Sequence, residues 1–172
     1  LHSDLHLTAI ENLYPIKKQK VIVSPHGNFE NVFPNKIKPN EARKRLAIPE
    51  DSIVFAFIGQ IRPYKGLENL FIAFSQLLEG TPQKIYLLVA GKTGHPYSKN
   101  YLTDKAALIR NTIVFPEFVA DEDLQLYFNA CDFIVAPYEE ILTSGSVISS
   151  LSFNKPVIAP KLGMIEEVIE HE

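Results

Sequence analysis

The sequence is poor in cysteine, with only Cys131 among 172 residues. One thiol excludes an internal disulfide framework and a zinc site built on cysteines, which agrees with a reducing compartment. Cys131 opens the apolar segment CDFIV (residues 131–135). A cysteine in such a segment usually packs as a small hydrophobic residue, so we expect a buried thiol. The alternative is a catalytic nucleophile.

Long apolar runs and an excess of positive charge are also missing. The longest apolar stretches, such as residues 53–58 and 85–90, have the length of strands. They fall well short of the ~20 residues that a membrane helix needs. The 17 Lys and Arg residues against 20 Asp and Glu give a net charge of −3. No overall positive field attracts nucleic acid or anionic lipid, so any phosphate binding must be local.

Two common nucleotide-binding signatures are absent. Lys92 and Thr93 follow Gly91 as in a P-loop, but that motif needs a glycine where Tyr86 stands. The chain also contains no G-x-G-x-x-G, so the loop of a dinucleotide-binding dehydrogenase is not supported.

The length and the 46% hydrophobic content fit one soluble domain with a sizeable core. The chain starts at Leu1, and its only methionine is Met164. We therefore expect a piece of a longer protein, in which residues 1–27 form a short helix-strand lead-in from an inter-domain region. Residues 28–172 would then form one Rossmann-like domain, truncated at its C-terminal end.

Short β-branched and aromatic runs alternate with longer segments of helical period, which is typical of βαβ units. The runs are mostly apolar at successive positions, as expected for strands covered on both sides. We predict an α/β fold, a Rossmann-like parallel sheet with helices on both faces. The predicted strands are residues 21–24, 53–58, 85–90, 113–115, 133–136 and 156–159.

Helical periodicity is clearest after residue 66. An apolar stripe of Leu67, Leu70, Phe71, Phe74, Leu77 and Leu78 predicts a helix that ends at Gly80. Residues 121–130 and 144–153 predict two more helices, and residues 5–14 predict a short first helix, capped by Ser3 and stopped by Pro15. Residues 27–38 are interpreted as a connecting loop.

In an open parallel sheet the ligand binds beyond the carboxyl ends of the strands. After residues 53–58 comes GQIRPYKG (residues 59–66), which places Arg62 and Lys65 in one turn. An arginine fork and a lysine point charge suit a diphosphate. The alternative is a solvated surface turn.

After residues 133–136 comes PYEEILTSGS (residues 137–146). Small and hydroxyl residues at a helix start leave backbone N–H groups free for an anion, although plain N-capping explains them equally. The candidates are Thr143, Ser144, Gly145 and Ser146 for the anion, and Glu139 and Glu140 for sugar hydroxyls. A solvated charge pair is the alternative for the two glutamates.

Together these segments resemble the nucleotide-sugar-binding C-terminal half of GT-B glycosyltransferases of the group 1 family. The resemblance extends from residue 21 to residue 172. Besides GQIRPYKG, it rests on VSPHG (23–27), LVAG (88–91), IVFPEFV (113–119) with DEDL (121–124), ACDFIVAP (130–137) and NKPVIA (154–159).

The resemblance implies that Lys65 contacts the donor diphosphate. The family's arginine position holds Gln60 here, and Arg62 is the substitute. The family's paired glutamates fall on Ile141 and Ser149, so Glu140 would take the sugar contact and Ser149 the ribose contact. The base is expected near Phe118 and Val119.

The function that the resemblance implies is donor binding in a glycosyltransferase, with Arg62, Lys65 and Glu140 as catalytic residues. Transfer would retain the anomeric configuration and use no metal or cofactor. The partners would be a nucleotide sugar and a missing N-terminal acceptor-binding domain, without which this piece would transfer nothing. The expected pathway is polysaccharide biosynthesis. The expected location is cytoplasmic, or on the cytoplasmic side of a membrane through the missing half. The alternatives are a non-catalytic α/β binding module and a nucleotide-sugar epimerase of the same plan.

Overall fold

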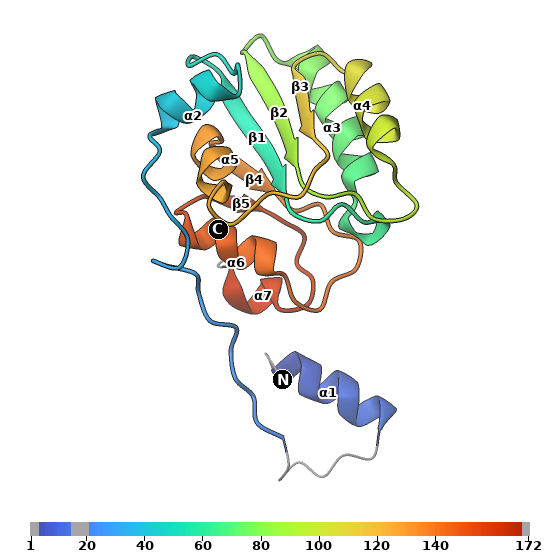
Figure 1. Ribbon diagram of the computed structural model, residues 1–172. Helices are drawn as coiled ribbons and strands as arrows, with labels where there is room; N and C mark the ends of the chain where they lie inside the picture. The colour runs from blue at the N-terminus through green and yellow to red at the C-terminus, as the bar shows by residue number, and fades with distance from the viewer. Residues whose placement is uncertain (1–3, 15–20, 170–172) are drawn as a thin grey trace.

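The computed structural model describes residues 4–14 and 21–169. Its centre is a parallel sheet of five strands in the order β3-β2-β1-β4-β5 (Figure 1). The α/β fold predicted from the sequence is confirmed. The strands are β1 (Ile53–Ile58), β2 (Ile85–Ala90), β3 (Thr112–Phe115), β4 (Phe133–Val135) and β5 (Val157–Ile158).

The longest pairing joins β1 to β2, from Ile53 opposite Ile85 to Ile58 opposite Ala90. These two strands have the predicted bounds, because their continuous apolar runs fit strands buried on both faces. The shorter strands β3, β4 and β5 differ from prediction by one or two residues at their ends.

The strand predicted at residues 21–24 is wrong. Residues 21–29 run as irregular chain, and Ile22 is 81% exposed. Figure 1 shows this segment leading away from the sheet toward α1 (Asp4–Leu13). A β-branched run becomes a strand only beside another strand, and this one does not reach the sheet edges at β3 and β5.

The predicted helices form with small shifts. Helix α3 (Leu67–Gly80) buries most of the predicted stripe, but Leu77 is 41% exposed. Helix α5 (Leu124–Ala130) begins three residues later than predicted because residues 120–123 form a turn, in which the Asp123 N–H donates to Ala120 O at 3.0 Å. Helix α6 (Gly145–Ser152) lies within its predicted range, and α1 begins and ends one residue earlier than predicted. Ser3 and Pro15 lie outside the described residues.

Four short elements were not predicted. Pro39, interpreted as part of a loop region, is the first residue of α2 (Pro39–Arg45), where a proline costs no hydrogen bond. Helix α4 (Lys99–Ala107) buries only Leu102 and Ala106, so it has no apolar stripe to detect. The others are the 3-10 turn η2 (Pro63–Lys65) and helix α7 (Ile165–Val168).

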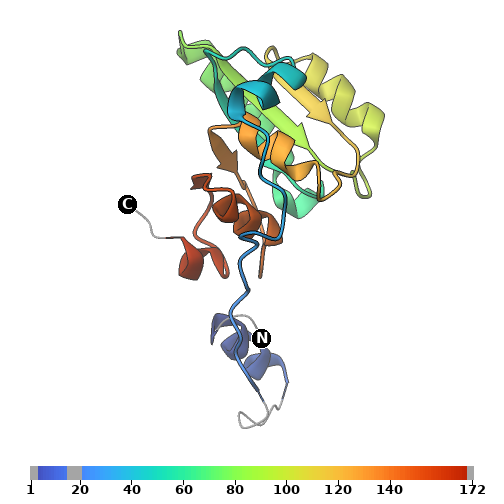
Figure 2. The ribbon, with the colours of Figure 1, turned by 60° about the vertical axis from the view of Figure 1, so that its left-hand side comes forward.

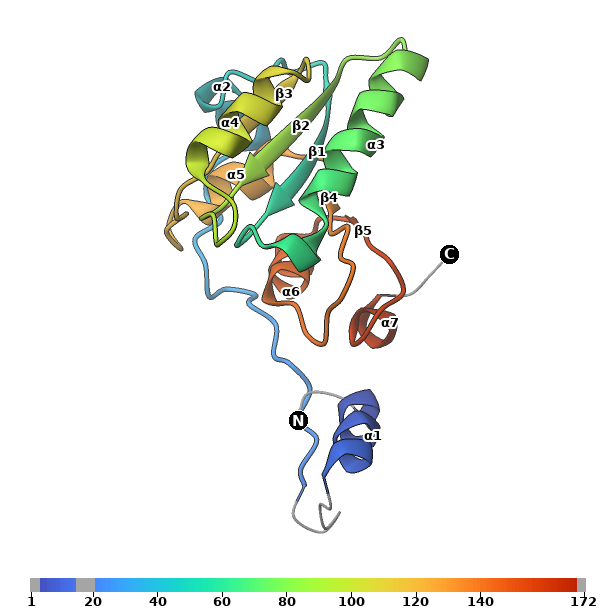
Figure 3. The same cartoon turned by 90° about the vertical axis from the view of Figure 1, so that its right-hand side faces the viewer.

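Two apolar layers cover the sheet. Phe57, Leu87 and Val89 pack with α3 and α4, whereas Val54, Ala56 and Ile58 pack with α2 and α5. Figure 3 shows α3 on one side of the sheet and α2 and α5 on the other. The alternation along β1 follows from the two-residue period of a strand and confirms helices on both faces.

Helix α1 lies apart from the sheet in the views of Figures 1 and 2. The division into residues 1–27 and 28–172, with an inter-domain origin for the first part, stays a prediction. In the part of the chain that the structure describes, every helix is too short or too polar to cross a bilayer.

Candidate anion and nucleotide site at the carboxyl end of the sheet

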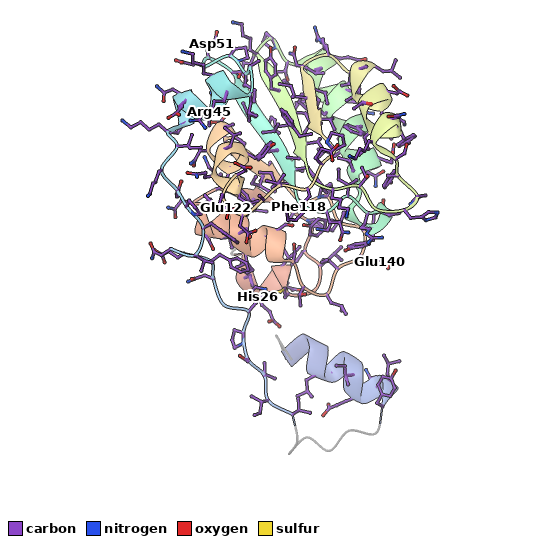
Figure 4. All side chains as sticks on the ribbon, viewed as in Figure 1. His26, Arg45, Asp51, Phe118, Glu122 and Glu140 are labelled. Carbon is purple, nitrogen blue, oxygen red and sulfur yellow. The ribbon has the colours of Figure 1, made fainter. Side chains whose placement is uncertain are left out.

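The candidate site lies where β1, β2 and β4 end. The arrowheads of β1 and β2 point toward α6 in Figure 1, so the segments that follow these strands meet beside that helix. Figure 4 shows Phe118 and Glu140 toward this end of the molecule, and Arg45 and Asp51 at the opposite end. This is the position in which open parallel sheets bind ligands.

The loop of residues 59–66 is held in place from both sides. The Ile61 N–H donates to Lys92 O and the Gly94 N–H donates to Ile61 O, each at 2.9 Å, which extends the pairing beyond β1 and β2. At its other end Gly66 has a φ of 67°. A Cβ there would clash with Pro137 O, so the loop packs on the segment after β4 only with glycine at this position.

This loop places Lys65 in a buried position with little compensation for its charge. Lys65 is 8% exposed, and its Nζ lies 3.5 Å from Ser146 Oγ and 5.2 Å from the centre of the Tyr138 ring. Burial lowers the pKa of the Lys65 ammonium to about 8. Among the described residues no carboxylate forms an ion pair with it.

The start of α6 supplies hydrogen-bond donors at the same place. Ser144 caps the helix, because its Oγ accepts from the Val147 N–H at 3.3 Å. The N–H groups of Gly145 and Ser146 find no acceptor within the described ranges. Gly59 faces this start, since a Cβ on Gly59 would overlap Ser146 Oγ. The structure therefore brings Lys65 and the predicted helix start together.

Arg62 is held differently. Its half-buried side chain lies across Gly94, where a Cβ would come within 2.7 Å of the guanidinium carbon. No hydrogen bond or ion pair joins it to Lys65 or to α6 in the described structure. A role for Arg62 at the diphosphate stays a prediction.

The candidate sugar contacts lie around a second hollow. Glu139 and Glu140 are exposed and line a cavity of about 630 Å³ together with Thr143. Glu139 Oε1 accepts a hydrogen bond from Asn69 Nδ2 at 2.8 Å. Ile141 lines the same cavity.

Ser149 is half-buried one turn into α6 and is not part of the lining of this cavity. The sugar and ribose contacts predicted for Glu139, Glu140 and Ser149 stay predictions.

A smaller and more apolar hollow of about 360 Å³ opens beside Gly59. It contains both predicted base contacts, Phe118, which is 73% exposed, and Val119. Sequence reasoning missed the rest of its lining, although most of it directly follows β1 and β2. These residues are Ile58, Gly59, Gln60, Gly91, Lys92 and Leu124.

Tyr138 was also missed. It stands between Pro137 and the two glutamates, and its hydroxyl lies 3.0 Å from Ser144 Oγ. Nothing in the local pattern marks it, because its contacts come from η2 and α6 rather than from its neighbours in the chain.

The expected buried thiol is confirmed. Cys131 is 1% exposed, its Sγ lies 3.3 Å from Phe128 O, and burial raises its pKa to about 12. A thiol in this state does not act as a nucleophile at neutral pH. In the described ranges, no group of three or more His, Cys, Asp or Glu side chains is close enough to hold a metal ion.

Comparisons with known proteins agree with this architecture. The D-inositol 3-phosphate glycosyltransferase of Stackebrandtia nassauensis is 32% identical over 164 residues, which cover 88% of this chain and 36% of that protein. Anabaena HepE, solved in complex with UDP and glucose, superposes with a TM-score of 0.78 at 22% identity, over 99% of this chain and 46% of HepE.

A C-terminal domain of a group 1 glycosyl transferase from Francisella tularensis gives a TM-score of 0.65 at 19% identity, over 82% of this chain and 74% of that domain. The chain thus spans only 36% of its Stackebrandtia relative and 46% of HepE. The family model of the group 1 glycosyl transferases matches residues 39–172. This chain therefore belongs to the group 1 glycosyl transferase family.

Proposed function

We propose that this chain is the donor-binding domain of a glycosyltransferase that moves a sugar from a nucleotide diphosphate sugar to an acceptor. One observation carries the proposal: Gly59 borders both the apolar hollow and the Lys65–Ser146 pair. A nucleoside diphosphate has the same two parts, a planar base and an anionic diphosphate. HepE, which shares this fold, was solved with UDP.

In this proposal Lys65 and the start of α6 hold the diphosphate. With a pKa of about 8, Lys65 is largely protonated at pH 7 and carries the positive charge. As the bond to the sugar breaks, negative charge grows on the departing diphosphate. Fixed donors stabilise such developing charge most effectively in a site that excludes water. Lys65 and the N–H groups of Gly145 and Ser146 would supply this stabilisation without a metal.

The donor sugar would occupy the cavity beside Glu139, Glu140 and Thr143. Glu140 is the stronger candidate for accepting sugar hydroxyls, because Glu139 already accepts a hydrogen bond from Asn69. Retention at the anomeric carbon is proposed from the family resemblance. An acceptor-binding domain from the rest of the protein, and a place at the cytoplasmic side of a membrane, are part of the same proposal.

The test is calorimetric titration of the chain with UDP, GDP, ADP and CDP. We expect one or more of them to bind, and we expect Gly59→Ala to weaken that binding because the new methyl group overlaps Ser146 Oγ. Gly80→Ala is the matched control, since a Cβ at Gly80 meets nothing within 4 Å.

Failure of all four nucleotides to bind the wild-type chain would support the non-catalytic module instead. Product analysis of the full-length protein with its donor separates transfer from epimerisation. Transfer yields a free nucleoside diphosphate, whereas epimerisation returns a nucleotide sugar.

A further inference from the structure

Tyr138 lies between the two halves of the candidate anion site. We propose that Tyr138 is a positioning residue whose ring holds the Lys65 ammonium against the start of α6, in the place where a buried lysine ordinarily has a carboxylate. The inference rests on the proposed function, since positioning matters for an anion that binds there. Tyr138 itself is not assigned any contact with the nucleotide.

The geometry places one side chain in contact with both elements. The Lys65 Nζ lies 5.2 Å from the centre of the Tyr138 ring, within the range of a cation–π contact. The Tyr138 hydroxyl lies 3.0 Å from Ser144 Oγ, and Ser144 caps α6. Tyr138 thus connects η2, which carries Lys65, to the helix whose first two N–H groups find no acceptor among the described residues.

A ring and a carboxylate would leave Lys65 in different states. A carboxylate would neutralise the ammonium and compete with a diphosphate for it. The ring face attracts the ammonium through its quadrupole and leaves the N–H donors free to turn to a ligand. The ammonium interacts with the Tyr138 ring and Ser146 Oγ, and no carboxylate among the described residues forms an ion pair with it. Burial, which lowers the pKa of Lys65, acts without any opposing acidic partner.

The ring and the hydroxyl of Tyr138 have separate tasks. Burial raises the pKa of the Tyr138 hydroxyl, although the Ser144 and Ser146 hydroxyls act in the other direction and nearby Tyr64 adds slightly to the increase. The hydroxyl therefore stays protonated and can donate to Ser144. Phenylalanine keeps the ring over Lys65 and removes only the interactions of the hydroxyl with Ser144 and Ser146. Leucine removes both contacts.

A merely structural role is the competing explanation, because Tyr138 is 5% exposed and belongs to the apolar core with Phe74. The direction of the change in the Lys65 pKa separates the two roles. Burial lowers this pKa, so packing lost around the ammonium raises it, whereas loss of the attraction of the ring lowers it. Lysine residues labelled with ¹³C at Cε report this pKa by NMR titration, and Lys65→Met assigns the signal. UDP affinity at pH 7 is measured on the same variants.

We expect Tyr138→Leu to lower the pKa of Lys65 by roughly 0.5–1 unit and to weaken UDP binding roughly 3- to 30-fold. Tyr138→Phe should keep both values close to wild type. Phe74→Leu, a matched loss of an aromatic core residue, should reduce stability and leave the Lys65 pKa unchanged. If Tyr138→Leu does not fold, Tyr138→Met fills the space with a flexible side chain and is compared with Tyr138→Phe in its place.

Two results would overturn the inference. One is that Tyr138→Phe weakens UDP binding as much as Tyr138→Leu does. The other is that Phe74→Leu shifts the Lys65 pKa as much as Tyr138→Leu does. If the wild-type chain binds no UDP, GDP, ADP or CDP, the proposed function fails. The positioning of Lys65 is then decided by the titration of the ligand-free chain alone.

Discussion

Two buried cations lie at opposite ends of the parallel sheet, and their surroundings differ sharply. At the amino end, the Arg43 side chain is 11% exposed and pairs with Asp132 Oδ2 at 2.8 Å. Its guanidinium also donates to the carbonyl oxygens of Ala130, Glu50 and Ser52. At the carboxyl end, Lys65 is 8% exposed and contacts a hydroxyl and an aromatic ring, and no carboxylate among the described residues forms an ion pair with it.

The difference separates a cation that serves the fold from one that remains available to a ligand. Arg43 joins α2 to the starts of β1 and β4, because Asp132 Oδ2 also accepts from the Val54 N–H at 2.7 Å. Its charge and donors are used within the protein. A buried charge without such partners is costly, and proteins retain one mainly where function requires it.

The largest change in stability is expected from removing Arg43 at the amino end of the sheet, where its charge is paired. Arg43→Ala leaves the Asp132 carboxylate without its cation and removes a donor from three carbonyl oxygens, and we expect it to lower the free energy of unfolding by about 3 kcal/mol. Urea denaturation measures this change. Arg45→Ala is the control, because Arg45 lies on the exposed face of α2 in an ion pair with Glu41, and surface pairs of this kind contribute little. Equal losses in both variants would contradict the assignment of Arg43.

The next largest effect is expected on nucleotide binding when Lys65, the cation without a carboxylate partner among the described residues, is removed. Lys65→Met should weaken nucleotide binding by about 1.5–3 kcal/mol, or roughly 10- to 150-fold, since a charge-assisted contact is lost. The same variant should be as stable as the wild type or more stable, because an unpaired buried charge is replaced by an apolar chain. Calorimetry and urea denaturation measure the two values. Lys84→Met, at an exposed ion pair with Asp51, should change neither appreciably.

A smaller effect concerns pH. The pKa of Lys65 is lowered to about 8 in the folded chain from an ordinary value of 10.5, so the unfolded chain binds more protons between these values. Stability therefore rises with pH in this window, by up to about 1.4 kcal/mol for each pH unit. We expect the stability advantage of Lys65→Met over wild type to be constant below pH 8 and to shrink from pH 8 to pH 10.5.

The difference in stability between Lys65→Met and the wild type reports the contribution of Lys65 alone. Burial also raises the pKa values of Cys131 and Tyr138, which reduces stability as pH rises, but both groups are present in both proteins. An advantage that does not change with pH would show that Lys65 is not buried as a charged group.

The smallest effect is expected from cysteine labelling. Cys131 lies next to Asp132, and burial raises the pKa of its thiol to about 12. A thiol reagent should leave the native chain unmodified and should label it once urea unfolds it. Arg43→Ala should label faster than wild type at low urea because it weakens the end that covers Cys131. Lys65→Met should label at the wild-type rate or more slowly, and faster labelling of this variant would mean that the two ends are not independent.

Local sequence was sufficient to predict a helix or strand whose own residues carry the pattern that defines it. Continuous apolar runs predicted β1 and β2, and spacing of three and four residues predicted α3. The same reasoning failed at residues 21–24, because a strand needs a neighbouring strand that local sequence does not describe. It missed α4 because two buried residues are too few to form a visible stripe.

The residues of the candidate site likewise include some that local sequence predicted and some that it did not. Lys65 and the residues of the α6 start were predicted because parallel strands bring their carboxyl ends to one edge, so the loops after them must meet. Tyr138 and Gly59 were not predicted. The ring and hydroxyl of Tyr138 contact residues of other elements, and Gly59 matters because it has no side chain.

By itself, then, the sequence determined the order of the main strands and helices, the edge at which a ligand would bind, and one cation at that edge. Only the tertiary structure decided that Lys65 is buried without a carboxylate partner among the described residues while Arg43 pairs with Asp132, and that the Arg62 side chain lies across Gly94. The physical reason is that burial and charge compensation depend on atoms brought together from distant parts of the chain. Residue type and spacing record only which groups are available.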